Sequence, residues 1–512
     1  MEKKHQIDVT IEEFLYYAMF SIMLIMKGIG LEENTILFRT CILGIMVLFF
    51  FKIVYGNYSI WELVIISLTV LWGGYVLYNI GSSAILIYAF MAMGMKNIST
   101  EKVMKIGAVV WSVCFGATVT AAIFFGRIGG CVVHEKLGLG PILREGLGYA
   151  HPNVLHITYI LLMVFVLYNC KKQNIIRVSI LLLLGDAFVF VYSVSYTGLI
   201  ISFLIILSNI YYVKRKQFTR LEKLIMKLVL PVCIYLSTFF PVYLYSYGFW
   251  YDLLNPLLNN RIWLIKHYFY LYHPTLFGEK IVTEGISLDN SYVYAIGWYG
   301  IVFLIVMFAA YVILINKYIK QDRRRELAVI MPFLVAGLTE QFLFNASIKN
   351  ITFVFLGEML FSCVKGKQKE FQFISKYNKS YQINVEIFSR IKDKISDLNF
   401  NRMLVCFGGI FCVTFLLLCT KRFTSYEVVY ANEKSSDCDG ELVSGESIIE
   451  GENTMIIGRL SLEDNYYYFT RESSNLIKII EIRTRLSISI YISIIVTVIN
   501  GILTMRKKKN EI

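Results

Sequence analysis

Long apolar runs separated by short polar segments make up most of the chain. A helix needs about 20 apolar residues to cross a bilayer, and fourteen windows of roughly this kind occur along the sequence. They cover residues 11–28, 35–54, 60–79, 81–95, 105–125, 154–170, 175–193, 196–213, 225–245, 291–315, 327–345, 350–364, 403–420 and 486–504. The pattern predicts an all-α polytopic membrane protein with about 14 transmembrane helices packed as a bundle.

The composition agrees with this class. Of the 512 residues, 56% are hydrophobic and 15% are aromatic, and the mean hydropathy is +0.59. A soluble domain of this size is less apolar. The net charge of +13 comes mostly from Lys and Arg beside the apolar runs, where such residues set topology and contact anionic lipid. We therefore expect membrane lipid as a partner, and no nucleic acid.

The basic clusters also give a direction to the spans. Clusters at 214–216, 317–325 and 365–394 fall on the same side as the other clusters when fourteen spans are drawn. Because basic loops stay in the cytoplasm, both termini are expected there. The outward segments of any length are then 126–153, 246–290 and 421–485.

The first outward segment contains a charged, glycine-rich stretch, Arg144-Glu-Gly-Leu-Gly-Tyr-Ala-His-Pro-Asn153. Glycines let backbone amides approach an anion, and the Arg144 guanidinium can bind two phosphate oxygens at once. Pro152 is suited to open a helix that Asn153 could cap. His151 is then either an interfacial residue at a helix start or a proton carrier.

The second outward segment predicts an amphipathic helix from about 253 to 272, lying on the outer membrane surface as a lid or strut. It carries Arg261 and His267. Asp289 precedes the next span, where a carboxylate can be a general base or a helix N-cap. Glu340 is expected at the outer end of its span, on the same face. Asp186 lies in mid-span and either serves function or pairs with a basic neighbour.

The remaining motifs exclude other chemistry and divide the chain. The six histidines have no zinc-ligand spacing, and P-loop and dinucleotide fingerprints do not occur; we expect no metal and no cofactor. Residues 1–365 form the main membrane domain, and 366–402 a basic cytoplasmic linker. Residues 403–512 form a two-helix extension, whose outward module 421–485 has the alternation and glycines of a small β-rich domain.

Three stretches together resemble the O-antigen polymerase and ligase superfamily, with the closest likeness to bacterial capsular and exopolysaccharide polymerases. The first is Arg144-x-Gly-Leu-Gly-Tyr-Ala-His-Pro-Asn153, and the second is Tyr-Ser-x-Ser-x-Thr-Gly at 192–198. The third is Arg261 followed by Phe277-Gly278 and by Asp289-Asn290 ahead of Gly300. The resemblance covers roughly residues 10–365.

The resemblance implies a metal-independent glycosyltransferase with a GT-C-like bundle in the bacterial cytoplasmic membrane. It would polymerise undecaprenyl-pyrophosphate-linked oligosaccharide repeat units into capsular or exopolysaccharide on the outer face. Arg144 and Arg261 look like the arginines that bind the pyrophosphate of the donor and acceptor lipids. Asp289 stands where ligases have histidine, which favours a polymerase, and Tyr196 stands where related sequences often place arginine. The other residues expected to line the site are Asn153, His267, Asn290 and Glu340.

The chemistry of this transfer fits the same residues. The pyrophosphate leaving group gains negative charge, which fixed cations stabilise, and the attacking hydroxyl loses a proton, which His151 or Asp289 could accept. Single in-line attack inverts the anomeric centre. Two alternatives remain: a ligase that transfers finished polymer to another acceptor, and a flippase, which should show pseudo-symmetric halves. A chain-length regulator and a flippase are candidate partners, and the module 421–485 is either a polymer-binding or a passive element.

Overall fold

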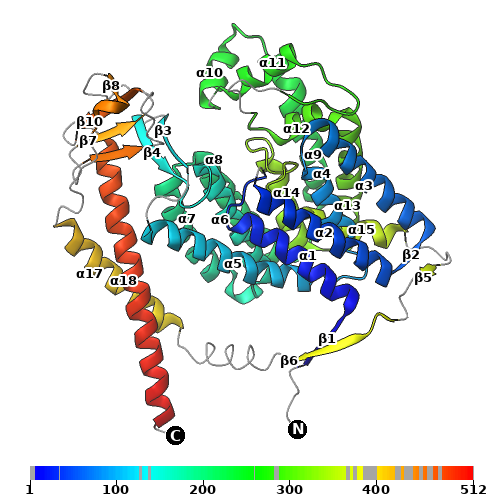
Figure 1. Cartoon of the computed structure of the whole chain (residues 1–512), viewed down its shortest axis with the longest axis horizontal. Helices are drawn as coiled ribbons and strands as arrows, with labels where there is room; N and C mark the ends of the chain where they lie inside the picture. Colours follow the sequence, from blue (N-terminus) through cyan, green and yellow to red (C-terminus); the bar gives the residue numbers. More distant parts are fainter. Residues whose placement is uncertain are drawn as a thin grey trace.

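The fold is known from a computed structural model of the whole chain (Figure 1). The residues that the structure describes are 6–33, 35–125, 130–136, 140–258, 260–281, 288–364, 370–372, 377–384, 400–420, 428–431, 442–448, 454–457, 465–470 and 475–510. Most of the predicted basic linker, 366–402, and much of the module 421–485 therefore lie outside the described residues.

Helices make up most of the molecule. The helical elements are α1 (Ile11–Gly28), α2 (Ile36–Tyr55), α3 (Ile60–Ile80), α4 (Ala84–Met93), α5 (Thr100–Phe124), α6 (Pro152–Asn169), η1 (Lys172–Asn174), α7 (Ile175–Ser193), α8 (Tyr196–Lys214), α9 (Arg220–Tyr243), α10 (Phe249–Leu257), α11 (Arg261–Leu271), α12 (Ser291–Tyr294), η2 (Ala295–Tyr299), α13 (Gly300–Lys320), α14 (Arg324–Ala336), α15 (Thr352–Val364), α17 (Phe400–Cys419), η4 (Gly445–Ser447) and α18 (Asn475–Asn510).

Short strands form small sheets at the two ends of the bundle. The strands are β1 (Gln6–Thr10), β2 (Asn57–Ser59), β3 (Cys131–Lys136), β4 (Gly140–Glu145), β5 (Glu370–Gln372), β6 (Ser380–Asn384), β7 (Val428–Ala431), β8 (Leu442–Ser444), β9 (Thr454–Ile457) and β10 (Asn465–Thr470). Among the described residues, β3 pairs with β4, β1 with β6 and β2 with β5, all antiparallel. A four-stranded sheet has the order β8-β10-β7-β9.

Ten helical segments of the described chain are long and apolar enough to cross a membrane. This agrees with the prediction of a mostly helical, polytopic membrane protein. They are Ile36–Tyr55, Ile60–Ile80, Thr100–Phe124, Pro152–Asn169, Lys172–Ser193, Tyr196–Lys214, Arg220–Tyr243, Ser291–Lys320, Arg402–Cys419 and Lys478–Thr504. Each coincides with one of the fourteen predicted spans.

The other four predicted spans have a different character. Helix α1 is 18 residues long but contains Glu12, Glu13 and Lys27. Helix α4 has 10 residues, all of them buried, and α14 and α15 have 13 residues each. A helix that is apolar on every side suits the interior of a large protein as well as it suits lipid. Helix α4, which is buried along its whole length, has this interior character.

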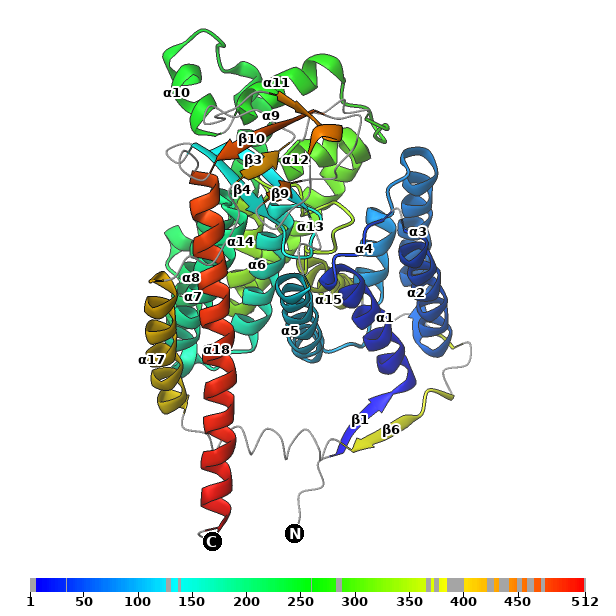
Figure 2. The ribbon, with the colours of Figure 1, turned by 60° about the vertical axis from the view of Figure 1, so that its left-hand side comes forward.

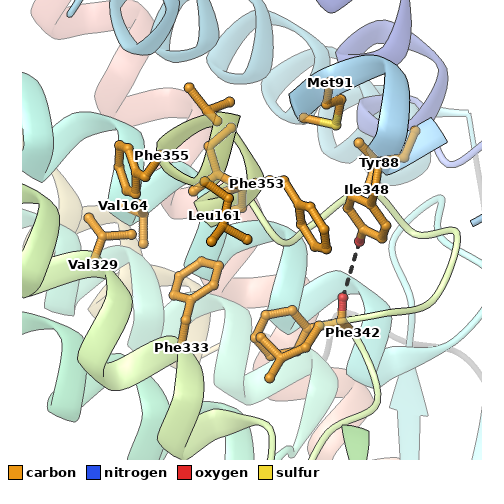
Figure 3. Close-up of a cluster of buried hydrophobic side chains, with 14 of the residues drawn as sticks. Tyr88, Met91, Leu161, Val164, Val329, Phe333, Phe342, Ile348, Phe353 and Phe355 are labelled. Atoms are coloured by element: carbon orange, nitrogen blue, oxygen red, sulfur yellow. Dashed lines mark hydrogen bonds between the residues drawn. The ribbon is translucent and has the colours of Figure 1, made fainter. Parts of the chain in front are cut away.

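Helix α6 lies at the centre of the bundle. In its apolar window 72% of the residues are buried, against 39% or less in each of the other candidate spans. Figure 3 shows Leu161 and Val164 of α6 packed among side chains of α4, α14, α15 and the segment that joins the last two. In this cluster the rings of Tyr88 and Phe353 are stacked, with centroids 4.1 Å apart. Aromatic side chains thus fill part of the space between these four helices.

The elements divide between two ends of the bundle. Figures 1 and 2 show the β3–β4 hairpin, α10, α11 and the four-stranded sheet together at one end, and the β1–β6 pair with the last turns of α18 at the other. We call the first end the site end. The three segments predicted to face outward therefore contribute to the same end of the molecule.

The structure adds detail to three local predictions. The predicted helix 253–272 is two helices, α10 and α11, separated at Asn260, whose φ is +60°. Within the predicted linker 366–402, strands β5 and β6 pair with β2 and β1 of the membrane domain. The last residues of the predicted module 421–485 belong to α18, which begins at Asn475.

Helices α6 and α8 pack closely enough to give a test of the fold. A Cβ atom at Gly198 would lie 2.4 Å from Cγ of His156, whereas one at Gly116 on α5 would have no neighbour within 4 Å. We expect Gly198→Ala to lower the free energy of unfolding by about 1–3 kcal/mol, and Gly116→Ala to leave it unchanged or raised. Thermal unfolding of both variants in detergent measures this. Equal melting temperatures would contradict the observed packing.

Candidate functional site

The β3–β4 hairpin brings Arg144 to the mouth of the helix bundle. Its side chain is buried, and its Nε donates to the carbonyl of Ser193 at the end of α7, 2.7 Å away. Its Nη2 donates to Oδ1 of Asn153 in the first turn of α6. Burial lowers the pKa of Arg144 to about 10, and the carboxylates of Glu340 and Asp289 act in the opposite direction. The guanidinium therefore keeps its charge at neutral pH in a largely dry environment.

The start of α6 differs from the prediction that Asn153 caps the helix. The N-cap is His151, whose Nδ1 accepts the backbone N–H of Asn153 at 3.1 Å, and Pro152 occupies the first turn. The Asn153 side chain instead accepts from Arg144. His151 thus fulfils the interpretation as a helix start, and proton transfer at its ring would have to use Nε2.

The second predicted outward segment, 246–290, brings Arg261 beside Asp289. Nη2 of Arg261 lies 3.6 Å from Oδ2 of Asp289. Nε of Arg261 is buried and has no hydrogen-bond partner among the described residues. Buried donors are nearly always satisfied in proteins, so this guanidinium is suited to receive an acceptor from a ligand.

Asn290, and not Asp289, caps the helix that follows. Oδ1 of Asn290 accepts the backbone N–H groups of Tyr292 at 3.0 Å and Val293 at 3.1 Å. Its Nδ2 donates to Ser237 and to the carbonyl of Leu338. The capping alternative for Asp289 is therefore wrong, and the carboxylate of Asp289 is directed to Arg261 instead.

Glu340 follows the end of α14 and reaches the same site. Oε1 accepts from Oγ1 of Thr197, in the first turn of α8, at 2.8 Å. Burial and the neighbouring Asp289 carboxylate raise the pKa of Glu340 to about 7, while Thr197, Arg261 and Lys349 act to lower it. A carboxyl group that exchanges its proton near neutral pH is typical of functional sites.

Sequence reasoning did not find Lys349, which lies in the segment between α14 and α15. It is buried, its Nζ donates to the carbonyl of Val154 at 3.2 Å, and burial lowers its pKa to about 7. Glu340 is among the charges that act on its pKa. The only sequence signal was a lysine close to an apolar run, which also describes many interfacial lysines. We call Arg144, Asn153, Arg261, Asp289, Glu340 and Lys349 the candidate site.

His267 is predicted to line this site, but the structure places it in a separate groove. Its ring stacks on Trp263 of the same helix, with centroids 5.0 Å apart. The groove has a volume of about 660 Å³. Its lining residues are Val242, Ser246, Tyr247, Tyr251, Trp263, Lys266, His267, Phe269 and Tyr270. None of the candidate-site residues lines it.

A buried polar network lies directly beneath Arg144. The His156 ring contacts Oγ of Ser193 through Nδ1 at 2.9 Å and Oδ1 of Asp186 through Nε2 at 3.0 Å. Asp186 also accepts from Ser202 of α8 at 2.7 Å. These side chains join α6, α7 and α8, which supports the interpretation of Asp186 as a residue that holds helices together. The backbone carbonyl of Ser193 also accepts from Arg144. The network therefore fixes the position of a residue that holds the Arg144 side chain.

The Tyr192–Gly198 stretch forms the junction between α7 and α8. Ser195 caps α8 by accepting the backbone N–H of Gly198 at 3.3 Å. Val194 has a φ of +41°, a conformation that costs a β-branched residue energy and that the surrounding contacts must offset. Tyr196 stacks on Phe190, with ring centroids 6.0 Å apart. The stretch thus positions Ser193 and Thr197 for contacts with Arg144 and Glu340.

The arrangement can bind an anion and move a proton. Arg144, Arg261 and Lys349 supply cations, while Asp289 and Glu340 supply carboxylates, in surroundings that strengthen electrostatic interactions. Among the described residues, no three His, Cys, Asp or Glu side chains are grouped so that they could hold a metal ion.

No family model, curated protein or solved structure matches this chain. The candidate site is therefore interpreted from the chemistry of its own residues.

Proposed function

We propose that the protein is a membrane glycosyltransferase that polymerises oligosaccharide repeat units carried on undecaprenyl pyrophosphate. One observation carries the proposal. Arg261 lies 3.6 Å from Asp289, and the charges of Asp289 and Glu340 also act on the pKa of Arg144, although the two arginines come from predicted outward segments more than one hundred residues apart. Guanidinium groups can bind a pyrophosphate that leaves, and a carboxylate beside them can accept the proton of a hydroxyl that attacks.

The arginines stabilise the leaving group in this proposal. Cleavage of the bond between the anomeric carbon and the pyrophosphate adds negative charge to the phosphate oxygens, and fixed donors aimed there lower the barrier. Arg261 has a buried Nε that lacks a partner within the described chain, and an incoming phosphate oxygen would supply the acceptor. Arg144 is already held by Asn153 and Ser193, so its orientation needs little adjustment when the substrate binds.

Asp289 is the general base that we favour, because Asn290 caps the helix that follows and the Asp289 carboxylate lies beside Arg261. The acceptor hydroxyl transfers its proton to Asp289 as it attacks the anomeric carbon, and the product has inverted configuration. Glu340, with a pKa of about 7, is placed to exchange a proton in the same site. His151 stays a second candidate through Nε2.

The site end would face away from the cytoplasm. Lys214, Lys317 and Lys320 lie in the last turns of α8 and α13, whose first turns lie at the site end. Basic residues at the opposite end favour that end as cytoplasmic. Lipid-linked repeat units, a chain-length regulator and a flippase are the partners that this arrangement would require.

An assay with purified protein in nanodiscs and a lipid-linked repeat unit, run with a chelator present, tests the function directly. Longer lipid-linked chains should accumulate and undecaprenyl pyrophosphate should be released. In cells, two outcomes would oppose the proposal when Arg144 is replaced. Long polymer that still forms but is not attached to the surface would indicate a ligase. Lipid-linked units that stay inside would indicate a flippase.

Conservative replacement of each arginine separates charge from geometry. We expect Arg144→Lys and Arg261→Lys to lower the polymerisation rate by about 10²-fold, because a single ammonium cannot reproduce a guanidinium that binds two oxygens. Arg177→Lys, at the exposed start of α7, is the matched control and should keep full activity. Initial rates of lipid-linked chain growth provide the measurement. Rates within twofold of wild type for both site variants would contradict the roles given to them.

The pH dependence of substrate binding should follow Glu340 and Lys349. As pH rises through about 7, Glu340 loses its proton and gains negative charge, and Lys349 loses its positive charge. Both changes oppose binding of the lipid-linked repeat unit, whose pyrophosphate is esterified at both ends and keeps a constant charge in this range. Affinity for the lipid-linked repeat unit should therefore fall on the order of tenfold between about pH 6 and about pH 8.

Glu340→Gln should flatten this profile, since its side chain cannot ionise, with a remainder due to Lys349. Binding isotherms at several pH values compare the two proteins. An affinity that rises with pH, or a wild-type profile retained in the variant, would show that Glu340 does not act on the bound anion.

A further inference from the structure

Arg483 on the long C-terminal helix α18 is buried against the candidate site. Only about 2% of its side chain is exposed, although it lies within the apolar segment Lys478–Thr504. A charged residue in such a segment is costly and is usually retained for function. Its Nη1 forms an ion pair with Oε1 of Glu145 at 3.1 Å.

The remaining donors of Arg483 reach two separate parts of the chain. Nη2 donates to the carbonyl of Leu143 in β4 at 2.6 Å and to that of Tyr192 in α7 at 3.2 Å. Nε donates to the carbonyl of Val191 at 2.9 Å. A guanidinium has five N–H donors in a fixed plane, so one side chain can hold β4 and the end of α7 at a set separation.

These contacts surround the one that orients Arg144. Leu143 and Glu145 are the neighbours of Arg144 in β4, and Tyr192 is the neighbour of Ser193, whose carbonyl accepts from Arg144. Arg483 therefore holds the residues on either side of the Arg144–Ser193 hydrogen bond. Side chains alternate along a strand, so Glu145 can face Arg483 while Arg144 faces the site.

We propose that Arg483 is a positioning residue of the candidate site, which fixes the β3–β4 hairpin on α7 and thereby orients Arg144 toward the pyrophosphate. The role of Arg144 in it rests on the proposed function. Helix α18 begins a few residues after β10 (Figure 2), so Arg483 also connects the C-terminal extension to β4 and α7 beside the candidate site.

Arg483 could instead serve only to attach α18 to the helix bundle, and Tyr491 provides a control for that alternative. Tyr491, on the same helix, donates to Thr120 of α5 at 3.1 Å and packs on Phe124. If Arg483 only attached α18 to the bundle, Tyr491→Leu would have the same consequences as Arg483→Ala. Arg485→Ala is the control for lost charge, because Arg485 pairs with Glu481 within α18.

Two measurements on the full-length protein in nanodiscs test the proposal. The first is the affinity for inorganic pyrophosphate. The second is the rate at which a membrane-impermeant maleimide labels Cys131, read at the peptide level; Cys131 pairs with Glu145 in the hairpin. We expect Arg483→Ala to weaken pyrophosphate binding about tenfold and to speed Cys131 labelling several-fold. Arg485→Ala and Tyr491→Leu should resemble wild type in both.

The outcomes separate the two proposals. Equal effects of Arg483→Ala and Tyr491→Leu, or no effect of Arg483→Ala on labelling and affinity, would overturn the positioning role while the proposed function stands. Failure of the wild-type protein to bind pyrophosphate would count against the proposed function, and Cys131 labelling would still decide whether Arg483 fixes the hairpin.

If Arg483→Ala does not fold, Arg483→Lys and Glu145→Gln replace it. The lysine keeps one ion pair but cannot donate to carbonyls of both segments, so both readouts should shift partway toward the alanine prediction. Wild-type values in both of these variants would also overturn the proposal.

Discussion

The burial of charged groups that must satisfy one another determines how the site end is organised. A guanidinium or carboxylate removed from water costs several kcal/mol unless charges and hydrogen bonds compensate it. Arg144 obtains this compensation from α6 and α7, and Arg261 from Asp289. Glu340 is held by α8. Segments from several parts of the sequence therefore come together because none of their charged groups can be buried alone.

Buried polar groups next to the candidate site also satisfy one another. The contacts among His156, Asp186, Ser193 and Ser202 join three helices beneath Arg144, and Arg483 joins β4 to α7 at its side. Helix α6, which carries His156, also packs in the aromatic core with α4, α14 and α15, and this core provides a rigid support (Figure 3). Such a support is what a site needs if its donors are to be oriented before the substrate arrives.

The apolar periodicity of the sequence was sufficient to predict the membrane class and the position of ten long helices. It does not distinguish an interior helix from a span, because a helix buried on all sides by protein, such as α4, is as apolar as one that faces lipid. The charged residues near the ends of apolar runs gave Arg144, Arg261, Asp289 and Glu340. Which residue caps each helix could not be predicted, since His151 and Asn153, or Asp289 and Asn290, are adjacent and only the local backbone decides between them. Lys349 and Arg483 carried no signal that set them apart from other basic residues beside apolar runs, because their partners lie far away in the sequence.

The central claim is that Arg144 and Arg261 bind one pyrophosphate together. A cryo-electron microscopy map of the protein in nanodiscs with undecaprenyl pyrophosphate would test it most directly. The account predicts density for the two phosphates between the guanidinium groups of Arg144 and Arg261, with Asp289 close by. Phosphate density at the opposite end of the bundle, or in the groove beside Trp263 and His267, would contradict it.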